Sequence, residues 1–299
     1  METERLPAYG GQALIEGVVM RGQHAVAAAM RAPDGNIVIQ KEELTGIYKS
    51  GIRKIPFLRG LVILWDALGL GTRFLTISAN IQSNEDEQME GPALYIPLIG
   101  ALLFGVALFF VAPALVGHLA EQLFHWNAWW GNLLEGLIRL GLVVGYIWGI
   151  GRLPDIKRVF QYHGAEHKTI NAFEAGAELT PENVKNYPLE HPRCGTSFLL
   201  TLVVLSVIVF AFLGPLPVAW RLISRVIAIP LLAGVAYEYT RWTANHLDSS
   251  FVSYLIRPNL ALQHLTTNEP SLDMLEVSIT AFKTMLAEEL AESGSEIVP

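Results

Sequence analysis

The sequence predicts a mainly α-helical, polytopic membrane protein with about four transmembrane helices and a small α+β cytoplasmic region at the N-terminal end. The first observation is composition: 52% of the 299 residues are hydrophobic and 16% are charged, whereas soluble domains carry about 25% charged residues. The second is four apolar stretches close to the roughly 20 residues that a spanning helix needs. We therefore expect an N-terminal region (1–91), a membrane domain (92–237) and a C-terminal tail (238–299).

The N-terminal region should contain a β-hairpin and an apolar helix. Residues 24–31 and 37–41 flank the turn sequence Pro33-Asp34-Gly35-Asn36, which is typical of a hairpin. Residues 57–81 are strongly apolar, but charged residues and glycines interrupt them, so we expect an interfacial or buried helix there rather than a span. An acidic linker should follow at 84–90. Residues 1–10 lack the apolar core of a signal peptide.

The expected spans are 92–117, 133–151, 198–213 and 218–237. The first contains no charged residue, whereas charged residues lie in the second and the fourth: Glu135, Arg139, Arg221 and Arg225. The three arginines can snorkel to the interface or face inward. The tail should form an amphipathic helix at 271–292, because apolar residues recur there at helical spacing.

The distribution of Lys and Arg predicts the orientation. Residues 1–91 hold nine, 118–132 hold none, 152–197 hold six, and the tail holds three of the 21. Because positive loops stay in the cytoplasm, both termini and the 152–197 loop should be cytoplasmic. The 118–132 segment, with Trp126, Trp129 and Trp130, should form an aromatic belt at the far interface. These features indicate a multi-pass protein of the inner (cytoplasmic) membrane.

The 152–197 loop contains the pattern that points to chemistry. Pro154 and Gly176 mark the ends of a helix, on which His163 and His167 lie side by side facing inward. His-x-x-Glu-His is the inverted zincin arrangement, in which the histidines bind a divalent metal such as zinc and the glutamate, here Glu166, activates water. The alternative is a structural histidine pair, satisfied by hydrogen bonds to carboxylates or backbone carbonyls.

Two histidines need a third ligand to make a catalytic zinc site. Glu238 follows the fourth span at the same membrane face and is the expected third ligand. Glu190, His191 and Cys194 are the alternatives. Cys194 is the one cysteine of the chain, so no intrachain disulfide can form. It can also be read as a nucleophile or as a buried thiol at a helix start.

Four segments, 10–22, 162–168, 191–198 and 262–270, resemble the signature motifs of the YqhQ-like family of bacterial membrane proteins. They occur in the family's order and extend over almost the whole chain. The resemblance implies a membrane protein of unknown function whose family label is that of a metal-dependent enzyme. In the first segment, Gln12, Glu16 and Arg21 can be read as part of a glycine-rich turn or of a site. The last segment can be read as the Thr/Asn-capped start of the tail helix.

The function expected from these patterns is that of a zinc-type membrane hydrolase acting on a peptide bond or a lipid ester at the cytoplasmic interface. The alternative is a non-enzymatic membrane scaffold or a partner of the membrane-insertion machinery, which the apolar 57–81 segment would serve as a contact surface. A transporter is a third, weaker reading. The net charge of −7 argues against nucleic acid as a partner.

Overall fold

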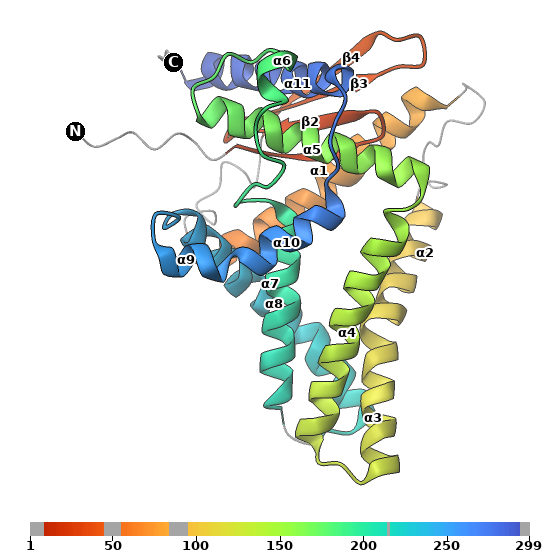
Figure 1. Cartoon of the computed structure of the whole chain (residues 1–299). Helices are drawn as coiled ribbons and strands as arrows, with labels where there is room; N and C mark the ends of the chain where they lie inside the picture. Colours follow the sequence, from red (N-terminus) through yellow and green to blue (C-terminus); the bar gives the residue numbers. More distant parts are fainter. Residues whose placement is uncertain (1–8, 45–54, 84–94, 214–215, 294–299) are drawn as a thin grey trace.

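The computed structural model describes residues 9–44, 55–83, 95–213 and 216–293. The described chain is mainly helical, with one small antiparallel sheet whose strand order is β1-β2-β3-β4. The sheet and the helices packed on it form one end of the molecule, and a bundle of long helices extends away from that end (Figure 1).

The predicted hairpin is confirmed. Strands β3 (Ala25–Arg31) and β4 (Ile37–Glu43) pair antiparallel from Arg31↔Ile37 onward. In the turn between them, Gly35 has φ +89°, and a left-handed conformation of this kind carries no steric cost for glycine. The 10–22 segment forms a second hairpin, β1 (Gly10–Leu14) with β2 (Gly17–Arg21), where the sequence indicated only a glycine-rich turn.

Helices cover both faces of the sheet. Successive side chains of a strand point to opposite faces, so Ala27 and Ala29 of β3 face one side and Val26 and Ala28 face the other. The first face packs against α5 (Pro154–Glu174) and α11 (Leu272–Ser293). The second packs against the C-terminal half of α1 (Leu58–Gln82) through Phe74.

The tail helix α11 is as predicted in extent and amphipathic character, and it lies on strands β2 and β3. Its buried residues include Met274, Leu275, Ile279, Phe282 and Met285. Near its end, the Glu289 carboxylate accepts hydrogen bonds from the backbone N–H groups of Gln23, His24 and Ala25. Part of the 238–299 region is therefore packed on strands of the 1–91 region.

The bundle contains four apolar helical segments. One is continuous from α2 (Tyr95–Val106) through the π-helix η5 (Ala107–Val111) to α3 (Ala112–Phe124). The others are α4 (Ala128–Ile150), α7 (Gly195–Ala211) and α8 (Val218–Ala244). Three described helices are long and apolar enough to cross a membrane, at Ile96–Phe124, Ala128–Ile150 and Ala219–Ala244, whereas α7 has 17 residues. Helix α7 is thus shorter than the roughly 20 residues of a standard span.

The arginines of the bundle face inward. Arg139, Arg221 and Arg225 are at most 2% exposed. The Glu135 carboxylate accepts hydrogen bonds from both Arg139 and Arg225, at 2.8 and 3.0 Å, and Arg221 pairs with Glu121. The sequence allows these arginines either to snorkel to the interface or to face inward. In the structure all three face inward.

Two short helices return the chain from α8 to the sheet. Helix α9 (Ser250–Leu255) is followed by α10 (Arg257–Thr266), which packs against α7. Helix α6 (Pro181–Val184) lies in the loop after α5.

The N-terminal half of α1 packs against α8 and leaves Trp65 and Leu68 exposed. The 57–81 helix is therefore buried on one side and open on the other, and the 84–90 linker lies outside the described residues.

Candidate metal centre

Helix α5 carries the candidate site across the junction between the sheet and the bundle (Figure 1). It begins at Pro154 and ends before Gly176, which has φ +70°, as the sequence predicted. Two glycines bring other segments close to it. A Cβ on Gly164 would lie 2.2 Å from the Asn268 carbonyl oxygen, and one on Gly11 would lie 2.9 Å from Glu166 Cγ. The 262–270 segment and β1 can therefore approach the helix beside its histidines.

Backbone carbonyls fix the orientation of both histidines. His163 Nδ1 lies 2.8 Å from the Thr266 carbonyl oxygen, and His167 Nδ1 lies 2.5 Å from that of Leu189. A carbonyl oxygen can only accept a hydrogen bond, so each Nδ1 is assigned the proton. The lone pair of each imidazole is then on Nε2. Metal-binding histidines are commonly oriented by a second partner in this manner.

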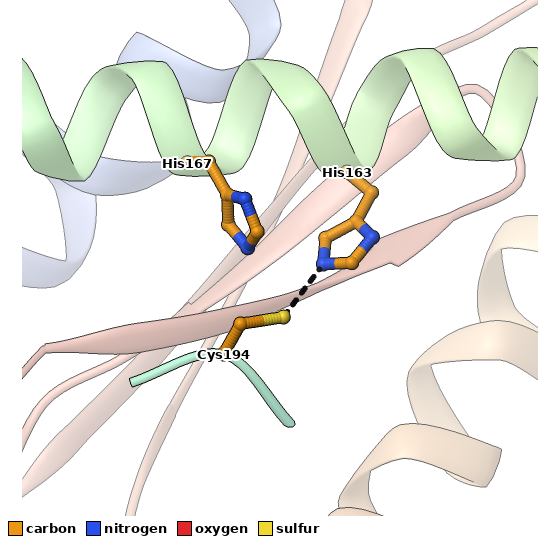
Figure 2. Close-up of side chains that lie close together, drawn as sticks. All are labelled: His163, His167 and Cys194. Carbon is orange, nitrogen blue, oxygen red and sulfur yellow. Dashed lines mark hydrogen bonds between the residues drawn. The ribbon is translucent and has the colours of Figure 1, made fainter. Parts of the chain in front are cut away.

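Cys194 faces the two Nε2 atoms from the start of α7. Its Sγ lies 3.3 Å from His163 Nε2, and Figure 2 shows both imidazoles of α5 pointing toward this sulfur. Cys194 is the N-cap residue of α7, where the backbone N–H of Thr196 donates to Sγ at 3.4 Å. The sulfur therefore accepts a hydrogen bond on one side and has the histidines on the other.

These three donor atoms fit a transition-metal ion. One ligand atom of each residue lies within 4.8 Å of the others. With Zn–N of about 2.05 Å and Zn–S of about 2.3 Å, the N···S edge of a tetrahedron is about 3.5 Å, close to the 3.3 Å between His163 and Cys194. His167 Nε2 is buried and has no hydrogen-bond partner, which is costly for an imidazole that binds nothing. Soft sulfur with imidazole is a donor set suited to zinc.

Glu166 lies beside this cluster. Its Oε2 is 3.9 Å from His163 Nε2, and the residue is 5% exposed. A buried carboxylate this close to the three residues is placed to accept a proton from a water molecule bound beside them.

The alternatives Glu190 and His191 occupy other positions. His191 is buried, and its ring centroid lies 5.7 Å from that of His167. Its Nε2 is 3.6 Å from Glu174, however, and it does not belong to the three-residue group. Burial lowers the pKa of His191, so the neutral imidazole is favoured. Glu190 Oε1 lies 3.1 Å from His264 Nε2.

Glu238, the expected third ligand, is not brought to the histidines. Its carboxylate pairs with Arg59 and accepts the backbone N–H of Phe57 at 3.0 Å. It therefore joins α8 to the start of α1. A position at the same membrane face was a weak criterion, because it does not specify where on that face a residue lies. In the structure, the third donor of the histidine group is Cys194.

The 10–22 segment positions α5 rather than supplying a donor. Glu16, at φ +53° in the β1–β2 turn, forms two hydrogen bonds of 2.5 Å with Arg158 and accepts one from Tyr162 at 3.2 Å. Burial, and secondarily Glu16, raises the pKa of Tyr162, so the phenol keeps its proton. Gln12 lies against Gly71 of α1. The segment ties α5 to the sheet at Arg158 and Tyr162, just before His163 in the sequence.

Sequence reasoning missed the groups that hold the site in place. Gln263 accepts from the backbone N–H of His191 at 2.8 Å and donates to its carbonyl at 2.9 Å. It also donates to Ser197 Oγ at 2.8 Å. Together with the Thr266 carbonyl, these contacts come from the 262–270 segment. The resemblance of this segment to a family motif is the sequence signal that could have pointed to these contacts, but the segment also has the pattern of a helix cap.

The fold and site together define a mainly helical chain with membrane-type helices, a small sheet and a His-His-Cys cluster between them. Residues 55–288 match the family described as "Protein of unknown function (DUF1385)". The chain is 38% identical to the uncharacterized protein YqhQ of Bacillus subtilis (strain 168), over 97% of this chain and 96% of the relative. The chain therefore belongs to this YqhQ-like family. No solved structure matches it.

Proposed function

We propose that this protein is a zinc-dependent membrane hydrolase with His163, His167 and Cys194 as its metal ligands. The observation that carries the proposal is the convergence of two imidazole Nε2 atoms and one thiol sulfur, with both Nδ1 protons held by backbone carbonyls. Three protein ligands and an open fourth position are the pattern of catalytic zinc sites.

In the proposed reaction, Glu166 is the general base. Zinc held by His163, His167 and Cys194 would supply an activated water, because zinc lowers the pKa of a bound water to about 7. Glu166, 3.9 Å from His163 Nε2, takes the proton of the attacking water and returns it to the leaving group. The Thr266 and Leu189 carbonyls keep both imidazoles in the tautomer that binds metal.

We infer that the bundle spans the inner membrane and that the sheet and both termini lie in the cytoplasm. Three helices are long and apolar enough to cross a bilayer, and the shorter apolar helix α7 makes the fourth crossing that returns the chain to its starting side. The absence of Lys and Arg from residues 118–132 supports this orientation. Helix α7 starts at Gly195, next to Cys194, so the metal centre lies where α7 enters the membrane. The substrate then meets the site at the cytoplasmic interface.

A non-enzymatic scaffold is the second candidate. The exposed Trp65 and Leu68 of α1 favour it, because an apolar surface of this kind can dock another membrane protein. In that case the His-His-Cys group would bind a structural ion and contribute to folding rather than to chemistry.

A Glu166→Gln variant separates the two candidates, assayed by zinc content, thermal stability in detergent and complementation of a deletion strain. If the protein is a hydrolase, the variant should keep its zinc and its stability, since a general base is not a metal ligand, but it should lose complementation. Glu190→Gln is the matched control and should complement. A Glu166→Gln protein that is folded, zinc-loaded and fully complementing would refute the hydrolase and leave the scaffold.

A further inference from the structure

A cavity in the bundle lies below the candidate metal centre. Its volume is about 250 Å³, near the lower end of the roughly 300–1,000 Å³ of small-molecule sites. Helices α4, α7 and α8 and the π-helix η5 line it, through residues that include Phe109, Val143, Leu199, Leu202, Val203 and Ile229.

The cavity lies along α7, beyond Cys194 at the start of the helix. Leu199 is five residues after Cys194 and Ser206 is twelve residues after it. At 1.5 Å per residue these positions are about 7.5 and 18 Å along the helix axis. The cavity thus extends over about 10 Å of α7, starting one and a half turns below the sulfur that faces the histidines.

The lining suits hydrocarbon and not water. Two polar side chains of the wall already have partners within the bundle: Arg139 donates to Glu135, to the Phe109 carbonyl and to Ser206. The remaining wall is almost entirely apolar, and a water molecule needs two to four polar partners to stay in a cavity. An apolar molecule is therefore the occupant that this space accepts.

The cavity also opens onto the apolar surface of the bundle. Tyr146 and Leu199 belong to its wall and are 43% and 39% exposed. On α8, exposed apolar side chains precede the lining residue Ile229, such as Val226 and Ile227. A lipid chain can enter from that surface without crossing a polar barrier, because the entrance and the wall have the same apolar character.

We propose that the cavity binds the acyl chain of the substrate, and that the substrate is a long-chain carboxylic ester drawn from the membrane lipids. This inference rests on the proposed hydrolase. The chain lies along α7 with its carbonyl end toward Cys194, His163 and Glu166. The oxygen of water adds to the ester carbonyl carbon and the bond from that carbon to the alkoxy oxygen breaks. Glu166 passes the proton of the water to the alkoxy oxygen, which gives a free fatty acid and an alcohol.

The first experiment locates the chain. Zinc-loaded protein in phosphatidylglycerol vesicles is irradiated with a phosphatidylglycerol that carries a diazirine in one acyl chain, and the labelled peptides are mapped. We expect the label to concentrate on α4 and α7. Leu202→Trp, which fills the cavity, should reduce it at least fivefold. Val209→Trp, on the exposed side of α7 and outside the cavity lining, should leave it within twofold. Equal labelling of the two variants would overturn the proposal.

The second experiment measures release of free fatty acid from the same lipid. Wild type and Val209→Trp should release it at similar rates, and Leu202→Trp and Glu166→Gln should each be at least tenfold slower. Labelling of the cavity without release by zinc-loaded wild type would make the chain a structural lipid and overturn the substrate assignment. Two other results would show that the hydrolase proposal itself has failed. One is equal, trace zinc in wild type and His163→Ala; the other is a Glu166→Gln protein that is folded, zinc-loaded and fully complementing.

Discussion

His163 Nε2 lies 3.3 Å from Cys194 Sγ, across 31 positions of sequence and between the middle of α5 and the start of α7 (Figure 2). The contact depends on two independent constraints. The Thr266 carbonyl turns the imidazole so that Nε2 faces the sulfur, and the N-cap position holds Cys194 at the start of α7. A metal ion placed between them would need little rearrangement of either side chain.

The first prediction concerns the ligand set. Purified wild type should contain about one zinc per chain, and Cys194→Ala, His163→Ala and His167→Ala should each contain less than a tenth of that amount, because two ligands hold zinc far more weakly than three. Elemental analysis after dialysis against a weak chelator measures this directly.

Glu238→Ala is the control for the ligand experiment. Because its carboxylate binds Arg59, the variant should keep its zinc while losing the contact between α8 and α1. Loss of zinc in Glu238→Ala together with retention in Cys194→Ala would reverse our assignment and restore the ligand expected from sequence alone.

The sequence predicts the helix of the site, but it places Cys194 only among the alternatives to Glu238 as the third donor. The spacing of His163, Glu166 and His167 predicts their common helix because all three lie within one turn of α5. Cys194, 27 residues beyond His167, reaches them through the loop that contains α6. Its position depends on how Gln263 holds the backbone of His191, and such a tertiary contact has no periodicity that a sequence can show.

For the fold as well, the sequence predicts the elements that depend on neighbouring residues and misses those that depend on distant contacts. The turn at Gly35 and the amphipathic pattern of α11 are local, and both predicted elements are confirmed. The pairing of β1 with β2 was missed because Gly10, Gly11 and Gly17 lower the strand propensity of that segment. Those glycines are needed for packing: a Cβ on Gly17 would lie 2.4 Å from the Ala29 carbonyl oxygen.

The second prediction concerns Glu289 and its neighbour Glu288. Three backbone N–H groups and His24 Nδ1 donate to the Glu289 carboxylate. Glu289→Ala leaves these four donors unpaired, one of them buried and the others part-buried, so we expect a loss of about 3 kcal/mol, at about 1–3 kcal/mol per orphaned buried group. The melting temperature in detergent should fall by about 5–10 °C.

Glu288→Ala is the matched control, one residue away on the same helix. Glu288 pairs with Lys41 on the surface, and exposed ion pairs contribute at most about 1 kcal/mol. Its melting temperature should stay within about 3 °C of wild type. Similar shifts for both variants would show that Glu289 does not anchor the β2–β3 turn.

The third prediction tests the proposed orientation by labelling single cysteines with a membrane-impermeant maleimide. Cys194 is buried, so it can remain in place and should be unreactive, which keeps the ligand set intact. Asn127→Cys, between α3 and α4, should react in intact cells. Gln40→Cys and Asn183→Cys, both exposed, should react only after lysis. Labelling of Gln40→Cys in intact cells would place the sheet on the far side of the membrane.

The fourth prediction concerns the ion pair of Arg221 with Glu121, inside the helical bundle. Arg221 is 1% exposed, and its Nη1 has no hydrogen-bond partner. The ion pair with Glu121 is therefore the main interaction that stabilises its buried charge. Glu121→Leu leaves a buried guanidinium unpaired, which costs about 3–5 kcal/mol. Arg221→Leu leaves the carboxylate unpaired and should also be destabilising.

The double variant Glu121→Leu/Arg221→Leu should be more stable than the Glu121→Leu single variant, because it removes both charges and replaces them with apolar groups of similar size. Melting temperatures in detergent, read as a double-mutant cycle, measure the coupling. The exposed pair Lys41 and Glu288 provides a reference cycle, in which the two single changes should add to within about 0.5 kcal/mol. If the two cycles give equal coupling energies, Arg221 is solvated in the folded protein, and the bundle does not bury it in the way that its 1% exposure indicates.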